Sequence, residues 1–312
     1  MPPLPVAATP HLATGLLLAA AGSVAFSGKA IIVKLAYRHG VDAVTLIMYR
    51  MLFALPLFLA LAWWATVRQG RGERTPLTGK DALGILGLGV TGYYLASFLD
   101  FWGLQYISAS LERLILYLNP TLVLILGWVV YQRRITGLQA LAMAVSYAGV
   151  LLVFGHEADF AGPDALLGAA LVFGSAISYA IYLVYSGELV KRLGAMRLVG
   201  LATSVACLLC LLQFVLLRPM SAAIVAPEVI WLSLLNATLC TFAPVIMVMM
   251  AIERIGAGLA AQTGMIGPMS TIAMGVVLLD EPFNAWIVAG TVLVVAGVFL
   301  VTRFGSAAAR PD

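Results

Sequence analysis

Charged residues are scarce in this chain: of its 312 residues only 10% are Asp, Glu, Lys or Arg, whereas 62% are hydrophobic. Soluble domains carry about a quarter charged residues, so a water-soluble globular fold is excluded. The alternation of apolar and polar residues in segments of about ten, which is typical of membrane β-barrels, is also missing. Apolar runs of about 18 residues or more recur instead, and each can cross a membrane as one helix. The composition therefore predicts an all-α membrane protein.

Cysteine and histidine are also rare, with three of each. Cys207, Cys210 and Cys240 lie within apolar runs; Cys207 and Cys210 could form a redox pair, but their surroundings favour small packing residues. The histidines lie at the ends of apolar runs or in loops, and no Cys/His spacing of a metal site occurs. No Gly-x-x-x-x-Gly-Lys-Ser loop for nucleotides is present. We predict no cofactor, no bound metal and no enzymatic catalysis.

The apolar runs predict ten membrane spans. Their expected ranges are 12–35, 43–67, 82–104, 108–131, 136–155, 164–187, 197–217, 229–252, 257–279 and 284–303. The segment from Gly103 to Ser110 carries no charge, so nine spans with one long re-entrant segment is the alternative. The first 14 residues contain no Lys or Arg, so the basic start of a secretory signal peptide is missing and the first span is expected to remain in the protein.

Basic residues punctuate these spans on one side. With the N-terminus in the cytoplasm, the inner connections and tails carry Arg68, Arg71, Arg74, Lys80, Arg133, Arg134, Lys191, Arg192, Arg197, Arg254, Arg303 and Arg310. Only Arg38 and Arg218 fall clearly outside. The positive-inside rule therefore predicts a multi-pass protein of a bacterial-type inner membrane, with both termini cytoplasmic. The net charge of +4 is distributed among the connections, so no nucleic-acid partner is expected.

An internal repeat appears when the chain is shifted by 148 residues. Pro120 then falls on Pro268, and the run 148–150 (Ala-Gly-Val) falls on the same run at 296–298. Five spans in each half force the second half upside down relative to the first, which is the inverted repeat of secondary transporters. We expect a cytoplasmic tail at 1–11, a first repeat at 12–155, an external connection at 156–163, a second repeat at 164–303 and a cytoplasmic tail at 304–312.

Several short motifs resemble the EamA-type branch of the drug/metabolite transporter superfamily. They are Ser27-Gly28-Lys29 with Lys34, Tyr49-Arg50, and two Pro-interrupted helices that end in Gln132-Arg133-Arg134 and in Asp280-Glu281-Pro282. The resemblance implies ten helices in two repeats and export of small metabolites or drugs against a proton gradient, although some relatives exchange substrates. The sequence departs from the family in the first repeat, where Arg133-Arg134 stands in place of an acidic residue like Glu281.

Five ionisable residues fall inside apolar spans, namely Lys29, Arg50, Asp100, Glu112 and Arg113. Each costs roughly 2.5–3.5 kcal/mol at a helix centre, so a functional or paired role is expected. Three cations and two carboxylates could bind the carboxylate or phosphate of a metabolite, and Glu112 or Asp100 could exchange protons. The alternative is a structural network of ion pairs.

Uncharged polar residues and helix breaks are expected near the same place. The polar candidates for substrate binding or coupling are Tyr93, Ser97, Tyr117, Asn119, Ser178, Tyr179, Tyr182, Asn236, Gln262 and Thr263. Each of them taken singly is more typical of a hydrogen bond between helices. Pro120, Gly267 and Pro268 predict interruptions at matching places of the two repeats, which mark a binding site or, alternatively, packing kinks.

These features predict a secondary transporter that works by alternating access, with a small-molecule substrate, the lipid bilayer and protons as partners. Export is the expected direction, and an exchanger or importer of the same fold is the main alternative. A channel would show a repeated filter and an intramembrane enzyme would need a nucleophile or metal ligands at depth, so both are less favoured. Since one chain completes the cavity, a functional monomer is expected.

Overall fold

The computed structural model describes residues 10–68, 75–132, 135–161 and 164–305, and every regular element in these ranges is a helix. Within these described ranges, nine helical segments are long and apolar enough to cross a membrane, and Ile266–Leu279 is a shorter apolar helix. The short helix completes a tenth span, as predicted. The alternative with nine spans is wrong, because one helix ends at Gly103 and a separate one begins at Ala109.

The first repeat contains α1 (Pro10–Tyr37), α2 (Ala43–Arg68), α4 (Gly79–Gly89), η1 (Val90–Leu95), α5 (Ala96–Gly103), α6 (Ala109–Leu116), α7 (Asn119–Tyr131) and α8 (Gly137–Ala161). The second contains α9 (Ala165–Leu193), α10 (Ala195–Leu217), η2 (Met220–Ala223), α11 (Pro227–Ala237), η3 (Thr238–Phe242), α12 (Ala243–Thr263), α13 (Ile266–Leu279) and α14 (Ala285–Gly305). Helix α8 runs through Ala161, so most of the connection expected at 156–163 is helical. The outer parts of both expected tails, 1–9 and 306–312, lie outside the described residues.

Unusual backbone features recur with the spacing that the sequence repeat predicts. A π-helix, η1, begins at Val90 in the third span, and another, η3, begins at Thr238 in the eighth, 148 residues later. Gln132 and Asp280 end α7 and α13 in the left-handed conformation, with φ of 53° and 58°, and they too are 148 residues apart. The repeat is therefore present in the backbone as well as in the sequence.

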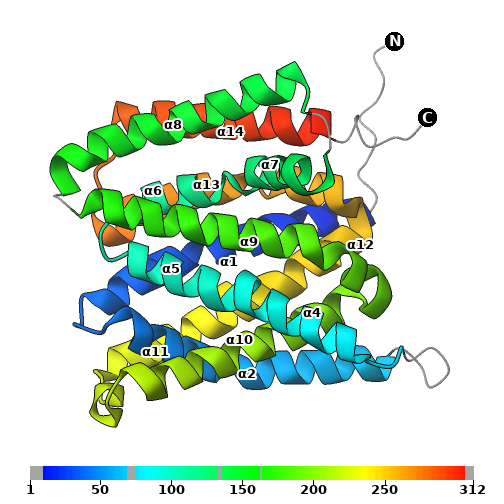
Figure 1. The fold of residues 1–312 in the computed structure, drawn as a ribbon. Helices are drawn as coiled ribbons and strands as arrows, with labels where there is room; N and C mark the ends of the chain where they lie inside the picture. Colours follow the sequence, from blue (N-terminus) through cyan, green and yellow to red (C-terminus); the bar gives the residue numbers. More distant parts are fainter. Residues whose placement is uncertain (1–9, 69–74, 133–134, 162–163, 306–312) are drawn as a thin grey trace, which may run out of the picture.

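The two repeats are interlocked in space. Helix α8 packs along α14, and α2 packs along α10; in both cases the partners are equivalent helices of the two repeats (Figure 1). Helix α5 packs on α9 of the second repeat, while α1 packs on α11 and α12. Each repeat thus contributes helices to the interior of the other, which is how inverted repeats build one shared cavity.

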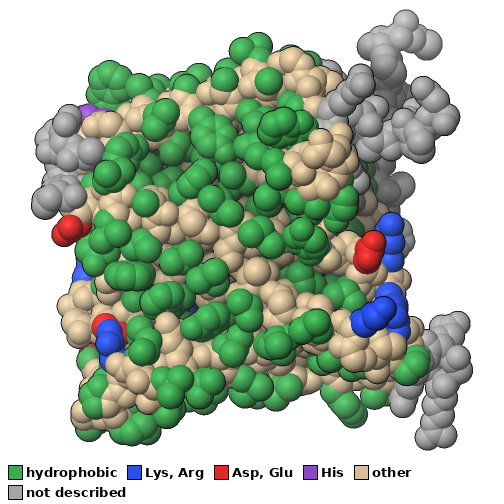
Figure 2. All heavy atoms as spheres, viewed as in Figure 1, with side chains coloured by type: hydrophobic (Ala, Val, Ile, Leu, Met, Phe, Trp, Pro, Cys, Tyr) green, Lys and Arg blue, Asp and Glu red, His purple; other side chains and the backbone are tan. Residues whose placement is uncertain are grey.

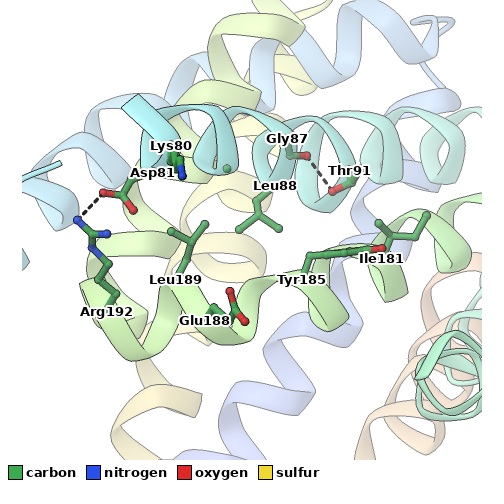
Figure 3. Close-up of a pocket in the computed structure, with 11 residues that line it drawn as sticks. Lys80, Asp81, Gly87, Leu88, Thr91, Ile181, Tyr185, Glu188, Leu189 and Arg192 are labelled. Atoms are coloured by element: carbon green, nitrogen blue, oxygen red, sulfur yellow. Dashed lines mark hydrogen bonds and ion pairs between the residues drawn. The ribbon is translucent and has the colours of Figure 1, made fainter. Parts of the chain in front are cut away.

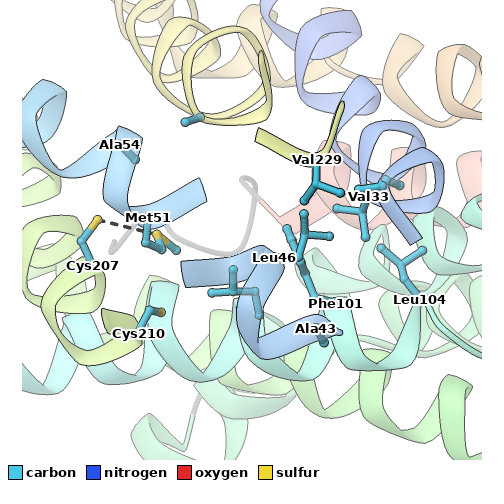
Figure 4. Packing of buried hydrophobic residues seen from close by; sticks show 14 of the residues in the cluster. Val33, Ala43, Leu46, Met51, Ala54, Phe101, Leu104, Cys207, Cys210 and Val229 are labelled. Carbon is cyan, nitrogen blue, oxygen red and sulfur yellow. Dashed lines mark hydrogen bonds between the residues drawn. The ribbon is translucent and has the colours of Figure 1, made fainter. Parts of the chain in front are cut away.

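Buried apolar side chains join α1, α2, α5, α10 and α11 into the largest core cluster. Met51, Cys207 and Cys210 lie together in it, and Cys207 Sγ is 3.6 Å from Met51 Sδ (Figure 4). All three cysteines of the chain are free and buried, so they serve as small polarisable packing residues.

The outside of the bundle is apolar. Figure 2 shows hydrophobic side chains over most of the visible face, with the charged side chains at its left and right edges. Large side chains such as Leu17, Trp63, Leu83 and Val277 are at least 70% exposed. Such a surface is stable only against lipid, so the charge-free belt lies in the hydrocarbon region.

Candidate functional site

A cavity of about 300 Å³ lies inside the bundle, between helices of both repeats. Its walls are Ser23, Phe26, Lys29, Arg50, Gly92, Tyr93, Ala96, Ser97, Asp100, Arg113, Leu116, Tyr117, Asn119, Ser175, Tyr179, Cys240 and Thr241. Nine of these were predicted as site residues: Lys29, Arg50, Tyr93, Ser97, Asp100, Arg113, Tyr117, Asn119 and Tyr179. The structure therefore brings most of the predicted polar and charged side chains to one place.

Both π-helices face this cavity. Gly92 and Tyr93 of η1 line it, and so do Cys240 and Thr241 of η3, their equivalents at a shift of 148 residues. A π-helix widens the turn and disturbs the regular i→i−4 hydrogen bonds, so nearby carbonyls need other donors. Serines of α9 supply them near η1. Ser178 Oγ donates to Thr91 O at 2.7 Å. Ser175 Oγ donates to Ala96 O, at the start of α5, at the same distance.

An ion cluster of Lys29, Asp100 and Glu112 closes one side of the cavity. Lys29 Nζ lies 2.5 Å from Asp100 Oδ2 and 3.0 Å from Glu112 Oε1. Asp100 is 3% exposed and Glu112 is fully buried, behind the cavity wall rather than in it. Asp100 Oδ1 and Glu112 Oε2, the oxygens that do not face Lys29, have no hydrogen-bond donor among the described residues. One ammonium group therefore serves two carboxylates in a nearly dry environment.

Two arginines lie on the other walls. Arg50 is 4% exposed, and its guanidinium carbon lies 4.4 Å from the centre of the Phe101 ring, at cation–π distance. Arg113 Nη2 donates a long hydrogen bond of 3.4 Å to Ser27 Oγ. The Nε atoms of both arginines are buried without a partner. Among the described residues no carboxylate oxygen lies within 4 Å of either guanidinium group.

Both repeats contain a helix break, and residues of the first break line the cavity. A turn after Leu116 separates α6 from α7, and a turn after Thr263 separates α12 from α13. Pro120 stands in the first turn of α7, where proline costs no hydrogen bond, so the chain breaks before the proline rather than kinking at it. Gly267 and Pro268 are buried in the first turn of α13.

Gly267 leaves room for Arg113. A β-carbon at this position would lie 2.7 Å from Arg113 Nη2, while the Gly267 carbonyl accepts a hydrogen bond of 2.7 Å from Ser27 Oγ. The break in the second repeat thus seats a cation that belongs to the first repeat. The equivalent break carries Asn119, whose Nδ2 donates to Leu116 O at 2.7 Å while its Oδ1 is buried without a donor.

Five other predicted residues lie outside the cavity walls. Tyr182 packs behind Tyr93 and stacks on Tyr179, with ring centres 5.5 Å apart in both pairs. Ser178 serves the carbonyl of η1 described above, and Asn236 Nδ2 donates to Lys29 O at 3.3 Å. The remaining two are on α12: Gln262 is exposed and Thr263 bonds to the carbonyl of Leu259 in its own helix.

Several cavity residues were missed by the sequence reasoning, above all Ser23, Phe26 and Thr241. A usable signal existed for one of them, because Thr241 is the equivalent of the predicted Tyr93 at a shift of 148 residues. No pattern in the sequence marks the π-helix that turns Cys240 and Thr241 inward.

Two glutamates join the helices at one end of the bundle, at the start of α6. Glu281 Oε1 accepts from Ala109 N at 2.6 Å, and its Oε2 accepts from Ser110 Oγ at 2.6 Å. Glu157, near the end of α8, accepts from Ser108 N at 2.6 Å and from Ser108 Oγ at 2.7 Å. Carboxylates at a helix N-terminus are stabilised by its free amides and its dipole. Glu281 therefore fastens the second repeat to the first at this end.

A separate groove of about 510 Å³ runs between α4 and α9 at the other end of the bundle. Figure 3 shows Arg192 paired with Asp81 across it, at 3.0 Å, with Leu88 and Leu189 between the two helices. Asp81 also caps α4, because its Oδ2 accepts from Thr78 N at 2.7 Å. Arg192 and Asp81 thus neutralise each other, and Lys80, Tyr185 and Glu188 in the walls of the groove are exposed, so the inner cavity is the better candidate for the functional site.

Comparisons with known proteins agree with this architecture. The sequence matches the EamA-like transporter family twice, over residues 13–155 and 166–303. It is 30% identical over 298 residues to the uncharacterized transporter YcbK of Bacillus subtilis, covering 93% of this chain and 91% of that protein. An uncharacterized transporter of Archaeoglobus fulgidus is 22% identical, with 92% and 96% covered. A crystal structure of another protein superposes with a TM-score of 0.62 at 16% identity, over 96% of this chain and 99% of that one, so the two share a fold.

Proposed function

Because the chain belongs to the EamA-like transporter family, we propose that it is a secondary carrier that exports a small metabolite or drug-like compound by alternating access. It works as a monomer in a bacterial-type inner membrane with both termini cytoplasmic. The observation that carries this proposal is the cavity itself, because equivalent residues of the two repeats, Tyr93 and Thr241, line it together. Rocking one repeat against the other would open such a shared cavity to each side in turn.

Uptake and release of a proton at the Lys29 cluster couple the cycle to the proton gradient. One ammonium cannot neutralise both Asp100 and Glu112, which lie 2.5 Å and 3.0 Å from it. An intramembrane carboxyl group with an imperfect counter-charge is the usual relay of proton-coupled carriers. A proton on either carboxyl leaves one matched ion pair, and its release restores the network seen here.

Orientation follows from the distribution of basic residues. Arg68 at the end of α2, Lys80 at the start of α4 and Lys191 near the end of α9 stand at one end of the bundle, where α1 begins and α14 ends (Figure 1). We assign this end to the cytoplasm by the positive-inside rule. The end that carries Glu157 and Glu281 is then the outer one.

Uptake into proteoliposomes tests the function. The compounds are labelled amino acids, organic anions and cationic drugs, each offered with no pH difference and with one of either sign. We expect saturable flux of at least one class that responds to the pH difference in wild type, responds less in Asp100→Asn or Glu112→Gln, and does not respond in the double variant. Glu228→Gln, at an exposed carboxylate that opens α11, is the matched control and should behave as wild type. Flux that never saturates would indicate a channel, and flux that ignores pH in every variant would disprove proton coupling.

A further inference from the structure

The two arginines of the cavity have no anion to neutralise them. Lys29 already serves Asp100 and Glu112, and no carboxylate oxygen of the described residues lies within 4 Å of Arg50 or Arg113. Their Nε atoms are buried without hydrogen bonds. A guanidinium group at membrane depth is costly unless it is paired or serves a ligand.

Neutral contacts satisfy these groups only in part. Arg50 has the face of the Phe101 ring at 4.4 Å, and Arg113 has one long hydrogen bond to Ser27. Each guanidinium offers five N–H donors, so most of this capacity is unused. Since both residues line the same cavity, the unused donors face a space that a ligand can enter.

We propose that this cavity recognises its substrate by an anionic oxyacid group, a carboxylate or a phosphate, held by Arg113 and Arg50, and that a proton taken up by Asp100 or Glu112 accompanies the anion. This inference rests on the proposed function and names its substrate class. Arginine suits the role because its planar fork binds carboxylate and phosphate oxygens in pairs.

The charges of the cavity determine whether a bound proton strengthens or weakens the binding of the substrate. Three cations and two carboxylates leave an excess of one positive charge, which one monovalent anion cancels. The ionisable groups that face Glu112 are Lys29 and Lys34 of α1, Asp100 of α5 and Arg113 of its own helix. Those that face Arg50 are Tyr37, Asp100, Cys207 and Cys210.

A proton on either carboxyl raises the positive excess to two, and in a medium of low permittivity this strengthens the attraction for an anion. Proton and anion therefore favour each other's binding, and the anion crosses together with a proton. Such a carrier exports an organic acid that has accumulated in the cell, driven by the acid's own outward gradient. A cationic substrate would instead compete with the proton.

The rest of the cavity suits a compact aromatic or apolar body. Phe26, Tyr93, Tyr117 and Tyr179 supply rings to its walls, and its volume of about 300 Å³ lies at the small end for ligand pockets. The substrate class is thus a small organic acid or a phosphate ester with one ring or a short chain.

Binding to the purified full-length protein in lipid nanodiscs tests the inference without any gradient or flux. The probes share one ring and differ in charge: benzoate, phenyl phosphate, benzylamine and benzyl alcohol. Affinity is measured calorimetrically at pH 6 and pH 8. We expect benzoate, phenyl phosphate or both to bind at least about tenfold more tightly than the other two, which is the scale of one charge-assisted hydrogen bond. Benzoate against phenyl phosphate separates the carboxylate from the phosphate.

Variants connect this binding to the named residues. Arg113→Gln and Arg50→Gln should each weaken anion binding at least about tenfold, and the Lys variants, which keep the charge, should weaken it less. Arg254→Gln, at an exposed position on α12, is the matched control with unchanged affinity. Wild type should bind benzoate, whose own charge does not change over this range, more tightly at pH 6 than at pH 8. Glu112→Gln, which mimics the protonated carboxyl, should lose at least part of this dependence while still binding the anion, and the double variant with Asp100→Asn should lose it completely.

Preference for benzylamine, no binding of either anion, or arginine variants that bind the anions as wild type does would overturn the inference. Anion affinity that rises with pH would overturn the proposed sign of coupling. These results are separable from a failure of the proposed function. Anion binding without flux would leave this inference standing and refute transport, whereas saturable flux restricted to cations would do the reverse.

Discussion

The two repeats agree in backbone and differ in chemistry. Both have a π-helix at the middle span, a break in the following span and a left-handed residue at its end. Lys29 and Arg50, however, correspond at a shift of 153 residues to Tyr182 and Thr203, and Glu112 corresponds at 148 to Ala260. The two repeats therefore contribute similar backbones to one cavity, whereas the charged residues that line this cavity all belong to the first repeat.

The ends of the molecule show the same contrast. At the outer end Glu281 fastens α13 to the amides of α6. Its equivalent in the first repeat is Arg133, which lies outside the described residues and has the opposite charge. At the position equivalent to Ser108, which caps α6, the second repeat has Gly256 with φ of 77°. The carboxylate contact between the repeats at this end therefore has no counterpart at the equivalent sequence positions of the opposite end.

Removing the cation of the charged repeat should have the largest effect. Lys29→Met leaves Asp100 and Glu112 buried without their counter-ion, and breaking a buried pair in this way costs about 3–5 kcal/mol. We expect loss of folded protein in detergent, measured by size-exclusion chromatography and thermal unfolding. The triple variant Lys29→Met/Asp100→Asn/Glu112→Gln should recover folding but not proton coupling. A single variant as stable as wild type would show that the three groups do not form a mutually dependent network.

Loosening the outer fastening should come next. Glu281→Gln removes the negative charge that accepts from Ala109 N and Ser110 Oγ, and charge-assisted hydrogen bonds contribute about 1.5–3 kcal/mol each. We expect the outer end to open about ten times more often. The rate at which a membrane-impermeant reagent alkylates Ala109→Cys reports this, with the three native cysteines replaced by alanine. Glu228→Gln in the same background is the control, and equal rates in both would exclude a fastening role.

The sequence alone predicts the ten spans and the grouping of the charged residues. The lengths of the apolar runs predict the ten spans, and the 148-residue shift predicts which spans correspond between the two repeats, because both depend on spacing along the chain. Glu112 was expected beside the other charges, and it does pair with Lys29, although behind the cavity wall. An isolated charge in lipid has a high free-energy cost, so charged residues inside the spans are found together where the helices contact one another.

The sequence does not predict how each helix is rotated about its own axis. A π-helix inserts one extra residue into the turn and so shifts every later side chain around the axis. Cys240 and Thr241 face the cavity because the extra residue of η3 rotates their side chains around the helix axis. A sequence pattern based on 3.6 residues per turn does not predict this rotation. Gln262 was expected at the site from its place before a break, yet it is exposed, because the packing of α12 on α1 decides which face turns inward.

A smaller change tests how the second repeat supports the cations of the first. Gly267→Ala places a methyl carbon 2.7 Å from Arg113 Nη2, which is too close for a van der Waals contact, so the guanidinium must shift. We expect anion affinity to fall severalfold while thermal stability changes by less than about 2 kcal/mol, since the neighbour is the mobile end of a long side chain. Gly155→Ala, in a helix position with open space around it, should leave binding unchanged. Wild-type affinity in Gly267→Ala would place the anion away from Arg113.

The smallest effect concerns an outer contact between the repeats, at Asp42. Its carboxylate caps α2 through Val44 N at 2.9 Å and pairs with Arg218 of the other repeat at 3.1 Å. Burial raises the pKa of Asp42, but hydrogen bonds from Thr45 and Arg218 outweigh burial and hold the pKa below its ordinary value. A carboxyl group whose folded pKa is depressed stabilises the fold above its unfolded pKa, and this contribution is lost as pH falls through the folded pKa.

Thermal unfolding at pH 7 should therefore show Asp42→Asn less stable than wild type, and the difference should shrink towards pH 3. Because both side chains are more than a third exposed, we expect only about 0.5–1 kcal/mol, mostly from the helix cap. A difference that grew as the pH fell would mean that the protonated carboxyl is the stabilising form, and the contact between the repeats would then not depend on charge.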